Sequence, residues 1–298
     1  MMSRRSALVL APLLFALAPL AGAHAARPHG GGGGAVLLRY RFVPGQTLAY
    51  QLTADVQAHT TTAGLPAGGS GLAPMGGVAS STQVSGVLQQ HVEGVDASGG
   101  ATVTVTLSSL VVTATIGGQT TTTPLTATAV PTTTVYIAPD GSQHGRGAVA
   151  MNGLNGLNGV NTQSVGALPP GPVLPGARWT TTSSTTLPLP ANGRSSLQFM
   201  VQNILRGYEQ LGGEPVAIID STEPINVATN LAVGGQSARL RETGTATAQT
   251  FFGLSTGQLV ASQSQENLLI GFSARVQGRA ASLQVRTIIQ SSLRRVGA

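Results

Sequence analysis

The chain contains one short block twice, and this internal repeat restricts the possible folds more than any other feature. Val43-Pro-Gly-Gln-Thr-Leu48 recurs as Leu174-Pro-Gly-Ala-Arg-Trp179. Further along, residues 94–105 align with residues 207–218 without a gap, and in both copies a Gly-Gly pair precedes an alternating apolar run. A duplicated block indicates two related structural units. Alternation of apolar and polar residues is typical of β-strands, so each unit is expected to be a β unit.

Alternation with a period of two continues through both units. Leu38, Tyr40 and Phe42 predict a first strand, and the pattern from Leu48 to Val56 predicts a second one after a turn at Pro44-Gly45. Further turns are expected at the following glycine-containing positions: Gly117-Gly118, Asp140-Gly141, Gly257 and Gly278. The predicted fold class is mainly β, with two tandem antiparallel units that form a curved sheet, a half-barrel or a barrel. Residues 194–211 fit either a strand or a helix.

Composition divides the chain into five segments. They are a signal peptide at 1–25, a Gly-rich leader at 26–34, a first β unit at 35–142, a low-complexity linker at 143–167 and a second β unit at 168–298. The linker contains three Asn-Gly pairs at three-residue spacing, which favours successive turns and builds no core. The pattern leaves open whether the two units share one sheet.

The first 25 residues have the three parts of a secretory signal. Arg4-Arg5 provide the positive charge, residues 7–21 the apolar core, and Ala23-His-Ala25 an A-x-A site with cleavage expected after Ala25. The general secretory route is favoured, and Ser3-Arg4-Arg5 keeps the twin-arginine route open. No later stretch is long and apolar enough to be a transmembrane helix. The mature chain is therefore expected in the periplasm or outside the cell.

The composition argues against several classes of function. The sequence has no cysteine, which rules out disulfides, thiolate chemistry and a lipidated cysteine, so a lipoprotein is not expected. All 16 positive residues are arginines, but they are scattered and only 4% of residues are aromatic. Nucleic-acid binding needs a basic patch, so no nucleic-acid partner is predicted.

Catalytic side chains are sparse. His91 has Glu93 and Asp96 close by in sequence, but no G-x-S-x-G turn supplies a nucleophile. Four carboxylates of the second unit are candidates for the two catalytic carboxylates of a glycosidase: Glu209, Glu214, Asp220 and Glu223. Such sites usually have aromatic platforms as well, and turns favour charged residues anyway. We therefore predict no catalytic residue, no metal site and no cofactor.

Two aromatic residues and one apolar surface remain as candidates for binding. Trp179 and Tyr208 are expected in the core rather than as anchors of a ligand cavity. The apolar faces of the last strands favour a groove for an acyl chain or another apolar molecule, or contact with an envelope component. The leading hypothesis is an exported, non-enzymatic binding protein. A structural or adhesive surface protein, suggested by Thr-rich strands, comes second, and a hydrolase third.

Several short motifs resemble a group of uncharacterised exported bacterial β-rich proteins. The matching residues are Leu38-Arg-Tyr-Arg-Phe-Val-Pro-Gly-Gln-Thr-Leu-Ala-Tyr50, Leu168-Pro-Pro-Gly171, Pro175-Gly-Ala-Arg-Trp179 and Gly257-Gln-Leu-Val260. Some members of that group are lipoproteins, and this chain departs from them because it lacks the cysteine. The resemblance implies no catalytic residues. A looser likeness, at the level of the fold, is to the half-barrel of bacterial lipoprotein carriers.

Overall fold

The computed structural model describes residues 34–63, 78–125, 132–144, 167–188, 194–233, 236–276 and 279–297. The predicted signal peptide with its expected cleavage site after Ala25, nearly all of the Gly-rich leader, most of the predicted linker and the turn expected at Gly278 lie outside the described residues. Within these ranges, no helix has the length and apolar character needed to cross a membrane.

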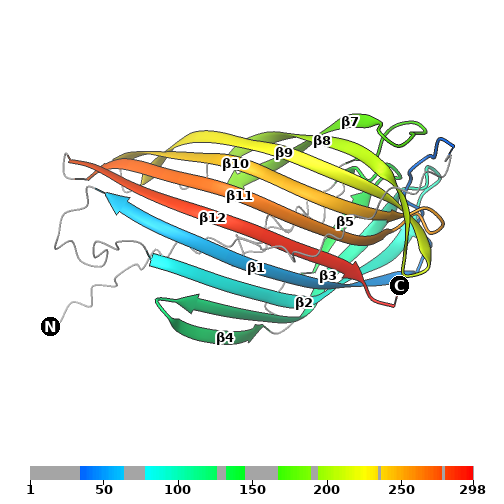
Figure 1. Cartoon of the computed structure of the whole chain (residues 1–298), viewed down its shortest axis with the longest axis horizontal. Coiled ribbons are helices and arrows are strands. Elements are labelled where there is room, and N and C mark those ends of the chain that lie inside the picture. Colours follow the sequence, from blue (N-terminus) through cyan, green and yellow to red (C-terminus); the bar gives the residue numbers. More distant parts are fainter. Residues whose placement is uncertain are drawn as a thin grey trace.

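Twelve antiparallel strands make up the fold (Figure 1). The first half of the chain forms β1 (Thr47–Ala63), β2 (Val78–Val95), β3 (Ala101–Ile116), β4 (Gln119–Leu125), β5 (Thr133–Ile137) and β6 (Gln143–His144). The second half forms β7 (Arg178–Pro188), β8 (Arg194–Leu211), β9 (Glu214–Val233), β10 (Gln236–Gly253), β11 (Leu259–Val276) and β12 (Arg279–Arg295). The predicted all-β antiparallel class is confirmed, and residues 194–211 form a strand.

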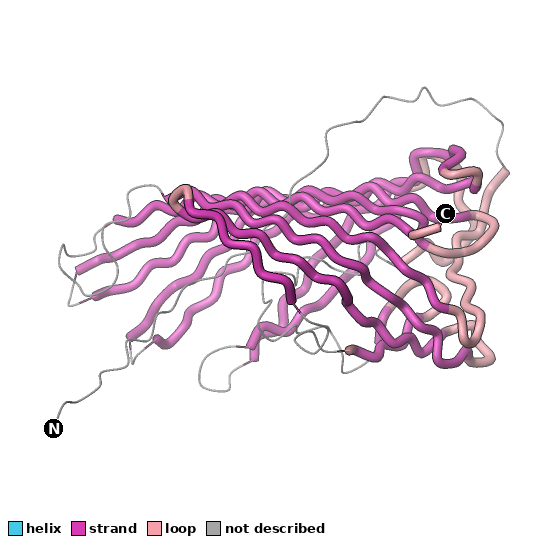
Figure 2. The backbone as a smooth tube through the Cα atoms, turned by 90° about the horizontal axis from the view of Figure 1, so that it is seen from below, coloured by secondary structure: helices cyan, strands magenta, loops and turns pink. Residues whose placement is uncertain are grey.

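The two halves of the chain share one sheet. Its strand order is β6-β5-β3-β2-β1-β12-β11-β10-β9-β8-β7, and β4 pairs with β3 beside this path. The first and last strands meet in the middle, where β1 pairs with β12 from Tyr50↔Arg295 to Ala63↔Ser282. The sheet is strongly twisted and curved but does not close into a barrel, because the edge strands β6 and β7 do not pair with each other in the described part of the chain (Figures 1 and 2).

The repeated block forms the same turn in both halves. The Gln46 amide donates to the Val43 carbonyl, and the Ala177 amide donates to the Leu174 carbonyl, both at 3.0 Å. Gly45 and Gly176 have φ values of 76° and 89°. Trp179 pairs with Asn203 as Leu48 pairs with Gln90, so the predicted match of Trp179 to Leu48 is confirmed.

The second part of the repeat matches only in its first strand. The alignment matches Gly94 of β2 to Gly207 of β8, and the strand pairing is irregular at both residues. In the following strand the alignment is wrong by three residues, because Gly94 pairs with Thr102 whereas Gly207 pairs with Ile218. The β8–β9 hairpin is longer and turns tightly at residues 212–213, and this extension moves the partner strand.

The prediction of a strand at residues 38–42 is wrong as well. This segment forms no ladder, since its backbone groups bond to loops: the Tyr40 amide donates to the Pro139 carbonyl at 2.7 Å and the Arg41 amide to the Gly257 carbonyl at 3.0 Å. The alternation still has structural meaning. Leu38 is fully buried, and Tyr40 stacks on Phe42 with ring centroids 5.6 Å apart.

The hydrophobic core lies along one face of the sheet. At one end, shown at the right of Figures 1 and 2, the segment 36–42 packs against strands of both halves, and Tyr40 meets Phe252 edge to face at 5.2 Å. The buried side chains there include Tyr50, Leu52 and Leu205. We call this end the packed end. The segment joins the two halves because it bonds to the Pro139 turn of one and the Gly257 turn of the other.

Candidate functional site

The face of the sheet that carries the core is called the inner face, and the opposite one the outer face. Residues directly opposite each other on paired strands point to the same side, as do alternate residues along a strand. Leu52 pairs with Leu293 and Val56 with Ile289, and all four are buried, which identifies this side as the inner face. Other described strand residues are placed by counting from these pairs, with allowance for the irregular pairing in β2, β8 and β10.

Three glutamates lie on the inner face. Glu266 of β11 pairs with the buried Ile289 of β12 on one side and with Ala246 of β10 on the other. Ala246 in turn pairs with Glu223 of β9, and Glu242 lies four residues from Ala246 along β10. Glu223, Glu242 and Glu266, here called the inner-face carboxylates, are all half-buried.

The inner face alters the ionisation of all three carboxylates. Burial raises the pKa of Glu266 to about 8, and the negative charges of Glu223 and Glu242 add to this effect. Burial also raises the pKa of Glu223 and of Glu242. Groups that share one low-dielectric surface resist holding several negative charges together. At neutral pH, Glu266 is therefore mostly protonated and able to donate a hydrogen bond.

Apolar side chains surround the carboxylates on the same face. The half-buried ones are Ile225, Leu240, Ile270, Phe272 and Leu283, and the buried ones include Val56, Val227, Leu268, Val285 and Ile289. The packed end is covered by segment 36–42, whereas these half-buried side chains on β9–β12 keep part of their surface accessible. An apolar surface with a few polar groups is the usual composition of a ligand site.

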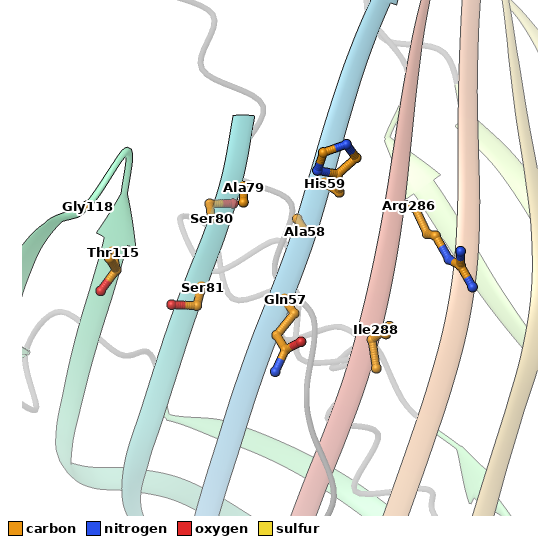
Figure 3. A pocket seen from close by; sticks show the side chains of 10 residues that line it. All are labelled: Gln57, Ala58, His59, Ala79, Ser80, Ser81, Thr115, Gly118, Arg286 and Ile288. Carbon is orange, nitrogen blue, oxygen red and sulfur yellow. The ribbon is translucent and has the colours of Figure 1, made fainter. Parts of the chain in front are cut away.

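Two open depressions occur among the described residues, and both involve mainly outer-face residues. One, of about 450 Å³, includes Gln57, His59, Arg286 and Ile288 (Figure 3). The other, of about 700 Å³, runs over β7–β11 and includes Arg206. Their linings are largely polar side chains and small residues. In the second, Arg206 already pairs with Asp220, with Nε and Oδ2 2.5 Å apart.

The structure places His91 on the solvent side. Its side chain is 45% exposed, Nδ1 lies 2.9 Å from Thr47 Oγ1, and Nε2 lies 4.0 Å from Glu93. Asp96 is separate, in the turn before β3, where it accepts hydrogen bonds from the Ser98 hydroxyl at 2.6 Å and the Tyr136 hydroxyl at 2.8 Å. These bonds lower the pKa of Asp96. The three residues do not form one site.

The four carboxylates considered as a glycosidase pair do not converge on one site either. Glu214 bonds to Arg295 and Thr256 at the packed end, and these bonds outweigh burial to lower its pKa. Asp220 lies on the outer face, as does Glu209. The register places only Glu223 on the inner face. Glu209 and Glu214 lie diagonally across the β8–β9 hairpin, but Glu214 is already bonded to Arg295.

Trp179 and Tyr208 both pack against the core, as expected, but each is only partly buried. The Trp179 indole Nε1 donates to the Ala167 carbonyl at 3.0 Å, and the residue also borders the 700 Å³ depression. The Tyr208 hydroxyl is buried and has no hydrogen-bond partner in the part of the chain that the structure describes, and burial raises its pKa. Core packing accounts for most of the surface of these two side chains.

Sequence reasoning missed Glu242 and Glu266, although a signal for them exists. Glu266 lies on the same side of its predicted strand as Leu268, Ile270 and Phe272, because even spacing separates them. Glu242 lies on the same side as Leu240 for the same reason. A charged residue in the apolar register of a strand predicts an inward-facing charge. Their proximity across three strands could be found only from the pairing of β9, β10 and β11.

Comparison with known proteins places the chain in no family. No family model matches it, and no curated protein is significantly similar to it.

Proposed function

We propose that this protein is an exported, non-enzymatic binding protein that holds an apolar ligand against the inner face of its sheet. The observation that supports it is the group of half-buried apolar side chains on β9–β12, beyond the part of the inner face that segment 36–42 covers. Partly accessible apolar surface on a curved sheet favours association with an apolar molecule, because such surface gains free energy when removed from water.

Native mass spectrometry of the mature protein, purified without detergent, tests this proposal. We expect an additional mass of lipid size that disappears when the protein is denatured. Phe272→Ser, on the inner face, should reduce the bound fraction severalfold, because it removes a large apolar contact. Leu269→Ser is the matched control, since Leu269 is 45% exposed on the outer face of the same strand. A bare protein that also takes up no added lipid contradicts the proposal.

Export is part of the proposal and has its own test. The signal-like residues 1–25 support it. The intact mass of protein recovered from outside the cytoplasm should correspond to a chain that begins at Ala26. An uncleaved chain retained in the cytoplasm would contradict export and would leave ligand binding to be judged separately.

A second candidate is a structural or adhesive surface protein. Threonine hydroxyls pair across neighbouring strands: Thr104 with Thr134 at 3.3 Å, Thr113 with Thr122 at 3.1 Å, and Thr115 with Thr120 at 2.8 Å. An open sheet also presents edge strands to other chains. Analytical ultracentrifugation distinguishes the two candidates. A discrete oligomer that dissociates when the edge strand β7 is disrupted favours assembly, and a monomer at all concentrations counts against it.

A further inference from the structure

The inner-face carboxylates lack a cationic partner in the described structure. Counting along the paired strands places Arg239, Arg241, Arg275 and Arg286 on the outer face, where each is exposed. Arg295, at the packed end, is bonded to Glu214. Half-buried carboxylates on an apolar face are costly when no positive charge or hydrogen bond compensates them. A cationic group from another molecule would remove this cost.

Thr287 provides a second, independent observation on the same face. It is only 1% exposed, and its Oγ1 atom has no hydrogen-bond partner among the described residues. Thr287 of β12 pairs with Leu268, so it lies diagonally across from Glu266 on the inner face. A buried hydroxyl without a partner is uncommon in proteins. Its buried oxygen therefore has an unused capacity to accept a hydrogen bond, on the same face as Glu266.

The spacing of the carboxylates does not suit a metal ion. Among the described residues, no three His, Asp or Glu side chains are grouped closely enough to hold one. Glu223 and Glu266 are two strands apart, which corresponds to about 10 Å between backbones. A metal ion requires ligand atoms within about 2.6 Å. An organic ammonium ion with an apolar body does not need such a close ligand shell, because it can bind one carboxylate directly and be attracted by the charge of the other two from a distance.

We infer that Glu266 and Thr287 bind the ammonium group of an apolar amine, and that Glu223 and Glu242 add negative charge from the neighbouring strands. This inference rests on the proposed function, because the apolar part of the ligand would occupy the apolar inner face around the carboxylates. Glu266 and its neighbours supply the negative charge, and Thr287 Oγ1 accepts one ammonium hydrogen bond. Inorganic cations and anionic lipids are the ligand classes that this arrangement disfavours.

Binding of an amine here depends on pH. Glu266 faces Glu242 of β10 and Glu223 beyond it on β9, while Thr287 and Ile289 face it from β12. With the pKa of Glu266 raised to about 8, a cation must displace a proton below that pH. Affinity for an amine should therefore rise with pH up to about 8 and become constant above it, while the amine itself stays charged.

Calorimetry with three probes of equal chain length tests the inference. Decylamine, decanol and decanoate differ only in their polar group, and about pH 8.5 keeps the amine protonated and the carboxylates ionised. We expect decylamine to bind at least about tenfold more tightly than decanol. One charge-assisted hydrogen bond is enough to produce a difference of this size. The double variant Glu223→Gln/Glu266→Gln should abolish this preference. Glu209→Gln, on the outer face, should leave it unchanged.

A second variant tests the hydroxyl without removing a charge. Thr287→Val keeps the shape of the side chain and should weaken decylamine severalfold. It should leave decyltrimethylammonium unaffected, because that ion has no N–H donor. Equal affinity of the wild type for decanol and decylamine overturns the inference and leaves the proposed function standing. Failure of all probes to bind the wild type overturns both.

Discussion

Glu266 is a half-buried carboxyl group in the middle of a sheet, and its ionisation is coupled to folding. Its pKa is raised from 4.5 to about 8 by burial first and then by two neighbouring glutamates. The folded protein thus keeps a proton on Glu266 that the unfolded chain releases above pH 4.5. The free energy of unfolding is consequently highest below pH 4.5 as far as this group is concerned, and it falls as the pH rises towards 8.

Glu266→Gln should remove this pH dependence. The glutamine is neutral at every pH, so above about pH 8 the variant should be more stable than the wild type by the order of a few kcal/mol. Urea denaturation at several pH values measures the difference. Glu209→Gln serves as the outer-face control. A wild-type stability that is the same at about pH 5 and pH 8.5 would show that the carboxyl group is ionised without cost.

The repeated turn gives a second prediction at the residue scale. Gly45 and Gly176 occupy left-handed conformations, and an added methyl group would meet nothing within 4 Å at either position. The cost of alanine is then conformational only, about 1 kcal/mol at each site. Thermal denaturation should show similar losses for Gly45→Ala and Gly176→Ala. Gly171→Ala, in open space with ordinary backbone angles, should be nearly neutral. Unequal losses would argue against equivalent turns.

At the scale of the elements, the short segment 36–42 is important because it contacts both halves of the chain and joins them. The Arg39 guanidinium donates to the Pro169 and Pro170 carbonyls, both at 2.6 Å, while Leu38 fills the core beneath. A short segment without a ladder can be held this way because each buried apolar side chain contributes a few kcal/mol. The attachment of segment 36–42 to the sheet should therefore depend on a few of its side chains.

Leu38→Ala should destabilise the protein by about 2 to 4 kcal/mol, since it leaves a cavity in the packed end. Its neighbour Leu37 is 52% exposed, so Leu37→Ala should cost less than about 0.5 kcal/mol. Chemical denaturation of the two variants in parallel measures this contrast. Similar losses for both would mean that the segment does not pack as the alternation of its residues indicates.

At the scale of the whole molecule, the pairing of the first and last long strands holds the sheet together. β1 pairs with β2 on one side and with β12 on the other, so its backbone is protected along most of its length. β6 and β7 have one neighbour each. Central strands open only with global unfolding, whereas edge strands open locally.

Hydrogen–deuterium exchange should reflect this order. Amides of β1 and β12 near the packed end, from residues 50–56 and 289–295, should exchange most slowly, and those of β7 should exchange much faster. Mass spectrometry of proteolytic fragments resolves these regions. Slow exchange in β7 at low protein concentration would contradict an open edge, and slow exchange only at high concentration would indicate edge-to-edge association.

The sequence by itself determined that the fold is mainly β, because period-two alternation reports which side of a backbone is buried. It left residues 194–211 open between a strand and a helix, and the structure shows a strand. The sequence also determined the tight turns at Gly117-Gly118, Asp140-Gly141 and Gly257, where each glycine has a positive φ. Residues 38–42 show the limit of this reasoning, since alternation predicts a buried side and does not say which backbone groups will pair. Trp179 and Leu48 could be matched because a shared turn precedes both.

Only the tertiary structure decided that both halves form one sheet, joined where β1 meets β12, and that β9, β10 and β11 bring Glu223, Glu242 and Glu266 onto one surface. The physical reason is that burial and turn formation depend on neighbours along the chain. Strand order and register depend instead on hydrogen bonds between residues far apart in sequence. No local pattern encodes those bonds.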